Sequence, residues 1–125
     1  MRQLGELEAV VMDRLWTWDR PVPVRAVLGD LQRDRAIAYT TVMTVLDNLH
    51  RKGFVTREKD GRAYHYHATT TREQHTAALM EQVLAGSSDR GAALLHFVER
   101  MPAEEIGRLR EALKGFGPDP EETSR

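Results

Sequence analysis

The fold is decided by one stretch, YTTVMTVLDNLHRKGFV, which spans residues 39–55. Its branched aliphatic residues recur at the i, i+3, i+4, i+7 spacing of a helix with one buried face. These residues are Val42, Val45, Leu46 and Leu49. Gly53 suits the position that closes a helix, because glycine adopts a left-handed backbone conformation without steric cost. The stretch therefore predicts a helix over 39–52 and, directly after it, a strand over 54–57.

The side of this helix that faces away from the core carries hydroxyl groups rather than long charged side chains. On a helical wheel, the outward residues are Thr40, Thr44, Asp47 and Arg51, flanked by Thr41 and Asn48. A threonine hydroxyl donates or accepts a hydrogen bond, and its methyl group can touch the thymine methyl in the major groove. At the end of the helix, Arg51 and Lys52 suit a phosphate backbone. Taken alone, such threonines more often cap and solvate an ordinary helix, but the basic segment after Gly53 favours nucleic acid.

That basic segment has the pattern of a hairpin. Asp60-Gly61 is a strong signal for a tight turn, so we expect the chain to return as a strand over 62–68. With these two residues as the loop, the cross-strand pairs are Lys59 with Arg62, Arg57 with Tyr64, and Val55 with Tyr66. Two like charges in one pair disfavour a hairpin unless an anion such as a phosphate lies between them. The alternative is that both side chains extend into water.

Weaker patterns place the remaining helices. Apolar spacing and proline positions predict five of them, over 4–17, 24–34 and 71–85, from about residue 88, and from Pro102 to about 114. A capping box is expected at the start of the helix over 71–85, formed either by Thr70 with Glu73 or by Thr71 with Gln74. Three helices and a hairpin within about 70 residues form a winged helix-turn-helix. The expected fold class is therefore mostly α within α+β, a winged helix followed by a small helical domain.

We expect three parts along the chain: a winged-helix DNA-binding domain over 1–70, a helical dimerisation domain over 71–115, and a disordered tail over 116–125. The second part holds more large apolar residues than three short helices can bury alone, so a second copy is expected to cover them. These residues are Leu79, Val83, Leu94, Phe97, Val98, Met101, Ile106, Leu109 and Leu113. The alternative is one continuous monomeric core.

Composition narrows the class of protein. The 125 residues carry a formal net charge of −1, but residues 50–72 hold six basic and two acidic side chains, which indicates a polyanion at one surface. The absence of cysteine excludes a disulfide scaffold, a thiolate zinc site and a thiol nucleophile. No apolar run approaches the roughly 18 residues of a membrane span, so we expect a soluble, cytoplasmic protein with no membrane insertion.

No arrangement of residues points to catalysis. His65 and His67 share one strand face at a spacing like that of metal ligands, but no carboxylate or thiolate is placed to complete a site. No glycine-rich phosphate loop, carboxylate pair or nucleophile arrangement is present. We therefore expect no enzyme, no cofactor and no metal. Two other binding functions stay open: a winged helix that contacts proteins, and a regulator that takes a small ligand between dimer helices.

Three segments together resemble the penicillinase repressor family, the BlaI/MecI/CopY group, and most of all its BlaI branch. Residues 39–55 are similar to its recognition helix, LEAVVMDRLW at 7–16 to its first helix, and GRAYHY at 61–66 to its wing. The resemblance covers about residues 4–114. The candidate DNA contacts are then Tyr39, Thr40, Thr41, Thr44, Asn48, Arg51 and Lys52 on the helix, with Arg57, Lys59 and Arg62 on the wing.

The resemblance implies a homodimeric bacterial repressor that binds palindromic double-stranded operators and controls β-lactamase or other antibiotic and cell-wall response genes. In the β-lactam-responsive members, a membrane sensor leads to cleavage at an Asn-Phe pair in the C-terminal domain, which weakens the dimer. The corresponding pair here is His96-Phe97, in which only the aromatic residue is kept. The cysteine-rich metal motif of the copper-responsive members has no counterpart in this cysteine-free chain.

Overall fold

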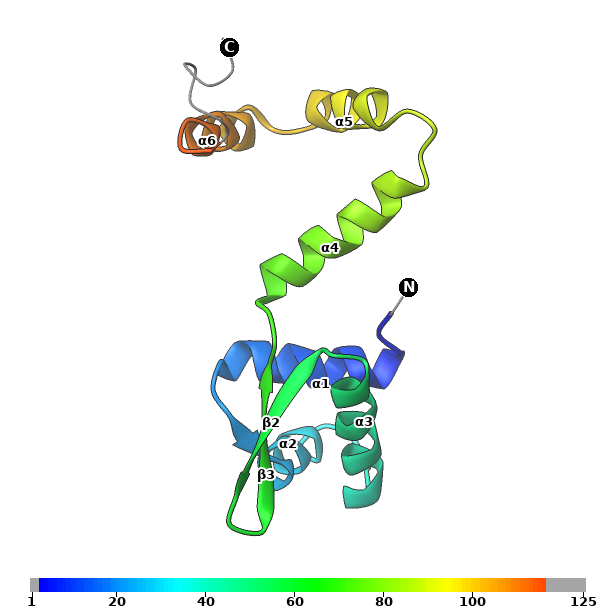
Figure 1. Ribbon diagram of the computed structural model, residues 1–125, viewed down its shortest axis with the longest axis vertical. Coiled ribbons are helices and arrows are strands. Elements are labelled where there is room, and N and C mark those ends of the chain that lie inside the picture. The colour runs from blue at the N-terminus through cyan, green and yellow to red at the C-terminus, as the bar shows by residue number, and fades with distance from the viewer. Residues whose placement is uncertain (1–2, 117–125) are drawn as a thin grey trace. The chain divides into compact units, whose positions relative to one another are not determined.

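The computed structural model describes residues 3–116, which contain six helices and three strands (Figure 1). In chain order the elements are α1 (Glu6–Trp18), β1 (Val22–Pro23), α2 (Val24–Leu31), α3 (Tyr39–Arg51), β2 (Val55–Asp60), β3 (Ala63–Ala68), α4 (Arg72–Ala85), α5 (Arg90–Glu99) and α6 (Ala103–Leu113). The three strands form one antiparallel sheet in the order β1-β3-β2. The predicted fold class, a winged helix within α+β, is confirmed.

The chain divides into two compact units, Met1–Leu79 and Met80–Arg125. This division lies inside α4, whereas the predicted domain boundary lies in the loop before it. The boundary at residue 70 therefore stays a prediction. The predicted tail lies, except for Phe116, outside the described residues.

The core of the first unit forms where α1, α2 and α3 pack together and against the sheet. The four aliphatic residues that predict the buried face of α3 are all buried. They meet Val11 and Leu15 of α1, Val27 and Leu31 of α2, and Tyr66 of the sheet. Gly53 follows the helix with φ of 86°, the left-handed conformation expected of it. The sequence prediction for this region is confirmed.

The strand β1 is not predicted by the sequence. Its two residues pair with β3, Val22 with Tyr66 and Pro23 with His65. A strand of two residues shows no alternating pattern, and its proline indicates an interruption rather than a strand. Proline is tolerated here because β1 is an edge strand, where one side needs no ladder hydrogen bond.

The predicted register of the hairpin is wrong. The loop lies one position later than predicted, so each cross-strand partner shifts by two residues. Asp60 pairs with Ala63, so the two loop residues are Gly61 and Arg62 rather than Asp60 and Gly61. Gly61 has φ of 65° at the first central position, which is the position that a type II′ turn reserves for glycine. Consequently Lys59 pairs with Tyr64, Arg57 with Tyr66 and Val55 with Ala68. The expected like-charge pair of Lys59 and Arg62 does not form.

The start of α4 is held against α1 and the loop after α3. The Trp16 indole N–H donates to the Thr70 carbonyl at 3.0 Å, and the Trp16 ring lies 5.1 Å from the His75 ring. The Arg72 guanidinium donates to the Asp13 carboxylate at 2.8 Å. Of the two capping boxes considered, the structure forms that of Thr71 with Gln74, in which each side chain bonds the other's backbone N–H.

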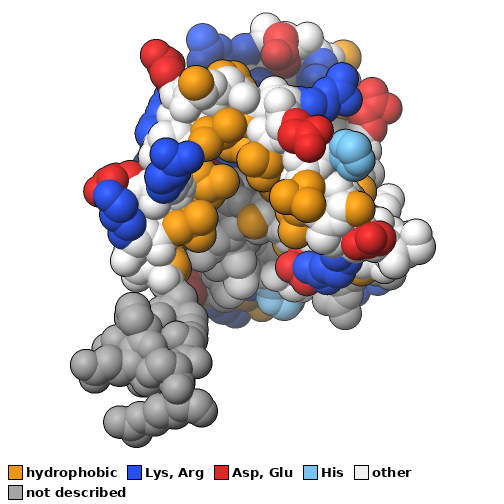
Figure 2. Space-filling view, turned by 90° about the horizontal axis from the view of Figure 1, so that it is seen from above, with side chains coloured by type: hydrophobic (Ala, Val, Ile, Leu, Met, Phe, Trp, Pro, Cys, Tyr) orange, Lys and Arg blue, Asp and Glu red, His pale blue; other side chains and the backbone are white. Residues whose placement is uncertain are grey.

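The later helices begin slightly later than predicted. Asp89 caps α5 by accepting a hydrogen bond from the Ala92 N–H at 3.1 Å, so the helix begins at Arg90 rather than near Ser88. Pro102 is the N-cap of α6 rather than its first helical residue. None of the residues of α4, α5 or α6 is buried. Figure 2 shows hydrophobic side chains grouped together on the surface of the C-terminal helices rather than scattered among charged ones.

Candidate nucleic-acid interface

The helix α3 presents a buried aliphatic side and an exposed polar side. Tyr39, Thr40, Thr41 and Thr44 are all exposed, opposite the four buried aliphatic residues. The N-cap residue Ala38 offers no side-chain acceptor, so the first-turn amides are not capped by a side chain. The structure therefore places hydroxyl groups and backbone amides together on the outer surface at the start of this helix.

Within α3, three of the predicted contact residues interact with their own helix. The Thr44 hydroxyl donates to the Thr40 carbonyl at 2.9 Å, which leaves its oxygen as an acceptor for an outside group. Arg51 donates from its guanidinium to the Asn48 side-chain oxygen. Asn48 is partly buried and Arg51 is exposed, so this bond directs the Asn48 amide while leaving other guanidinium N–H groups available.

Lys52 has a structural partner as well as a predicted role in DNA binding. Its ammonium group lies 2.7 Å from the Glu8 carboxylate and donates to the Gln3 carbonyl at 3.2 Å. Glu8 is only 8% exposed. Burial alone would raise the pKa of Glu8, but hydrogen bonds from Lys52 and the Gly5 N–H, with the charge of Lys52, outweigh burial and lower it. The ion pair joins the end of α3 to α1.

The three basic residues of the hairpin lie in different surroundings. Lys59 and Arg62 are exposed at and beside the turn, and neither makes an ion pair within residues 3–116. Arg57 instead donates to the Asp47 carboxylate at 3.1 Å, with its guanidinium carbon 4.3 Å from the centre of the Tyr64 ring. The pKa of Arg57 is raised, chiefly by a side-chain hydrogen bond with Tyr66 and to a smaller extent by the bond with Asp47. The hairpin tip thus carries two cations, Lys59 and Arg62, without an ion-pair partner among the described residues. The third cation, Arg57, is paired with Asp47.

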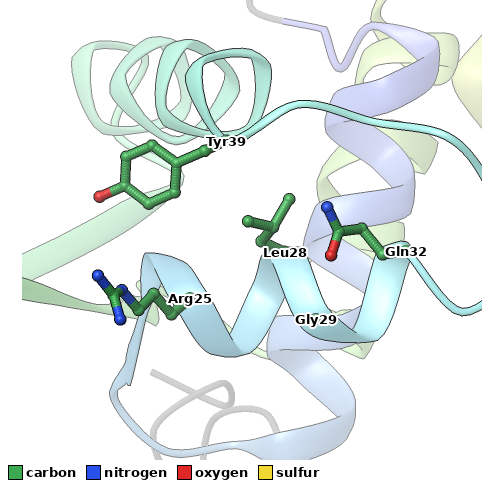
Figure 3. A pocket seen from close by; sticks show the side chains of 5 residues that line it. All are labelled: Arg25, Leu28, Gly29, Gln32 and Tyr39. Atoms are coloured by element: carbon green, nitrogen blue, oxygen red, sulfur yellow. The ribbon is translucent and has the colours of Figure 1, made fainter.

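Two open hollows border the start of α3. One of about 400 Å³ lies between α2, α3 and the hairpin, and its lining includes Arg25, Tyr39, Met43, Arg62 and Tyr64. The other, of about 490 Å³, is lined by Arg25, Leu28, Gly29, Gln32 and Tyr39. Figure 3 shows the Arg25 side chain, from the start of α2, on the same side of this hollow as the Tyr39 hydroxyl.

Arg25 is a candidate contact that sequence reasoning missed. It stands in the first turn of α2, fourteen positions before Tyr39, and it lines both hollows beside that residue. A single arginine on a short helix shows no local pattern. Only the packing of α2 against α3 brings it to the same surface as the predicted contacts.

The predicted dimerisation residues are partly or fully exposed in the single chain. Val83 is 76% exposed, Phe97 55% and Leu94 42%, while Val98, Met101 and Ile106 are half-buried. Leu79, Leu109 and Leu113 are exposed as well. The His96-Phe97 pair lies in the last turn of α5 with both side chains exposed. Their role in dimerisation stays a prediction.

Residues 3–116 contain no cluster of three or more histidine, aspartate or glutamate side chains that could hold a metal ion. Within the same residues, no helix combines the length and the apolar character needed to cross a bilayer.

Comparison with known proteins establishes the family. The penicillinase repressor family matches residues 4–115. The transcriptional regulator BlaI of Mycobacterium tuberculosis is 46% identical over 116 residues, which cover 90% of this chain and 84% of that protein. The methicillin resistance regulatory protein MecI of Mammaliicoccus sciuri is 23% identical over 117 residues, or 89% of this chain and 93% of that protein.

Among solved structures, one from a study of the DNA recognition and protein interaction domains of HOP2 aligns with 49% of this chain and 95% of its own, at 24% identity and a TM-score of 0.46. The family follows from the sequence matches. Because these matches span nine-tenths of the chain, it belongs to the penicillinase repressor family of transcriptional repressors.

Proposed function

We propose that two copies of this chain form a cytoplasmic repressor that binds palindromic operator DNA. The proposal depends on one observation: α3 exposes the hydroxyl groups of Thr40, Thr41 and Thr44 on its outer side, while the aliphatic residues of its inner side are buried. A helix of this kind in a winged helix enters the major groove, where hydroxyl and amide groups distinguish base pairs. Base contacts then come from Thr40, Thr41, Thr44 and Asn48.

Phosphate contacts come from the surroundings of α3. Tyr39 and Arg25 lie at its start, Arg51 and Lys52 at its end, and Lys59 and Arg62 at the hairpin tip. Such contacts orient the protein on the duplex and supply most of the salt-dependent affinity. The third basic residue of the hairpin, Arg57, is not counted among these phosphate contacts, because its guanidinium donates to the Asp47 carboxylate.

The dimer is proposed to form through the exposed apolar residues of α4, α5 and α6. One winged helix makes a small DNA interface, whereas a dimer offers two half-sites and gives the second module a high local concentration. Dimerisation also buries side chains such as Val83 and Phe97 that the single chain leaves in water.

Weakening the dimer is the proposed means of release. In this proposal a membrane sensor protease pathway acts on the chain, and the His96-Phe97 bond is the candidate site of cleavage. In a chain that has dissociated from the dimer, this bond lies within a helix that has no buried residue, so local unwinding to the extended form that proteases need costs little. Cleavage there prevents the chain from pairing again. The names of the relatives, penicillinase repressor and methicillin resistance regulatory protein, support target genes of antibiotic response.

The DNA-binding part of the proposal can be tested without knowing the operator. Selection of duplexes from a random library by the purified chain should yield a palindromic consensus, and sedimentation should show a dimer on it. A chain that sediments as a monomer and selects no consensus at low salt would overturn the proposal. Genome-wide footprinting with and without a β-lactam would then identify target genes and the inducing signal.

A further inference from the structure

We infer that Arg57 is a positioning residue, which holds the hairpin against α3 and so sets the angle at which the two elements reach DNA. This inference rests on the proposed function, because the angle matters only if α3 and the hairpin engage the same duplex. It also changes the role expected from the sequence, in which Arg57 contacts DNA as Lys59 and Arg62 do.

Arg57 lies on the face of the hairpin that packs against the core. Side chains alternate along a strand, so Arg57 shares its face with Val55, and its cross-strand partner is Tyr66. Both neighbours are buried, at 2% and 3% exposed. The Arg57 side chain is itself 27% exposed, so most of its surface is covered by protein.

The guanidinium of Arg57 makes contacts with two other elements. It donates to the Asp47 carboxylate of α3 at 3.1 Å and lies 4.3 Å above the Tyr64 ring of β3. A charge-assisted hydrogen bond and a cation–π contact are both directional, so together they restrain the hairpin relative to the helix. The positive charge of Arg57 is therefore directed into the junction between α3 and the hairpin.

The position of Asp47 also supports a positioning role for Arg57. It lies on the outward side of α3, its side chain is 62% exposed, and a carboxylate there repels phosphate. Its contact with Arg57 gives that acid a function that offsets the repulsion. The two possible roles predict opposite signs for its removal: simple electrostatics predicts tighter DNA binding, whereas positioning predicts weaker specific binding.

The test uses the consensus duplex that the unaltered chain selects from a random library, and a scrambled duplex of the same composition. Arg57→Met keeps the aliphatic stem and removes the charge, and Asp47→Asn removes the acid. Two matched controls lie near the turn: Lys59→Met removes an exposed cation, and Asp60→Asn removes an exposed acid at a turn position that accepts asparagine. Binding of all chains to both duplexes is measured at several salt concentrations.

Positioning predicts that Arg57→Met and Asp47→Asn each lower the ratio of consensus to scrambled affinity by about fivefold, the effect of losing one such restraint. The double variant should lose no more than Arg57→Met alone, because Arg57→Met already removes the charged contact that Asp47→Asn weakens. The slope of log affinity against log salt should stay unchanged in Arg57→Met and fall by about two in Lys59→Met, one for each copy in the proposed dimer. Asp60→Asn should strengthen binding to both duplexes.

The inference is overturned if Arg57→Met lowers the salt slope as Lys59→Met does while Asp47→Asn strengthens binding as Asp60→Asn does. Thermal unfolding of each variant shows whether it folds. If Arg57→Met does not fold, Asp47→Asn decides alone, because it exchanges one carboxylate oxygen of an exposed side chain for an amide group. An unaltered chain that selects no consensus would contradict the proposed function instead, so the two failures are distinguishable.

Discussion

Single residues decide how the stability of the first unit responds to acid, and the pair of Glu8 and Lys52 is the clearest case. The pKa of Glu8 in the folded chain is lowered, so the pair stabilises the fold above the ordinary carboxyl pKa of 4.5 and loses that contribution as the pH falls through the lowered value. Lys52→Met should destabilise the chain by about 1 kcal/mol at pH 7, because Glu8 keeps only the Gly5 N–H as a partner shown in the structure.

Urea denaturation at pH 7 and at pH 3 checks this prediction. The difference in unfolding free energy between the unaltered chain and Lys52→Met should shrink at the lower pH, because the protonated form of Glu8 becomes more populated below the ordinary carboxyl pKa of 4.5. A difference that grows at the lower pH would contradict a stabilising ion pair.

At the same scale, Thr44 and Arg62 should affect DNA binding in different ways. Thr44→Ala removes a hydroxyl and methyl from the outer side of α3, so it should change the preferred base at one position in each half of the operator.

Arg62→Ala removes an exposed cation from each copy, so it should weaken binding similarly on all duplexes and lower the salt slope by about two. Titrations of both variants with consensus and scrambled duplexes separate the two effects; a uniform loss in Thr44→Ala would contradict a base contact.

Elements show how far local sequence determines this fold. The buried side of α3 is predictable because four aliphatic residues at this spacing lie on one side of the chain only if the segment is a helix. The strand β1 is not, because Val22–Pro23 is too short for a pattern and pairs with residues more than forty positions away. The hairpin register depends on where Gly61, with its positive φ, lies in the loop. The loops Asp60-Gly61 and Gly61-Arg62 are both compatible with the sequence, and the pairing between β2 and β3 decides for the second.

The turn itself gives a prediction about stability. Gly61→Ala places a Cβ on a backbone with φ of 65°, so it should lower the unfolding free energy by about 1 kcal/mol. Gly29→Ala is the matched control, because an added Cβ meets nothing within 4 Å inside α2, and it should raise stability by about 0.5–1 kcal/mol. Urea denaturation of both variants measures the contrast, and equal effects would argue against the turn geometry.

At the scale of the whole molecule, the single chain leaves large apolar side chains exposed on its C-terminal helices. The candidate site on α3 could be predicted from one helix, but Arg25 and the engagement of Arg57 could not, since both follow from tertiary packing. The family shows a transcriptional repressor rather than an enzyme, as the sequence predicts. The prediction that two copies form a dimer is tested at an exposed apolar residue of α5, Phe97.

Phe97→Asp should weaken the dimer and thereby lower operator affinity about tenfold or more, although Phe97 belongs to a different compact unit from α3. Glu99→Gln, an exposed polar change on the same helix, is the control and should change neither property. Sedimentation reports the dimer and titration reports the affinity. Unchanged operator binding by a monomeric Phe97→Asp chain would show that DNA binding needs no second copy.

The contact between Trp16 and His75 has a practical consequence. The indole lies against an imidazole at the root of α4 and donates its N–H to the Thr70 carbonyl, so its emission reports whether that root stays attached to α1. In a Trp18→Phe background, detachment should shift the fluorescence of Trp16 to longer wavelength as water reaches the ring. Detachment of the start of α4 from α1 can thus be followed optically, without any added label.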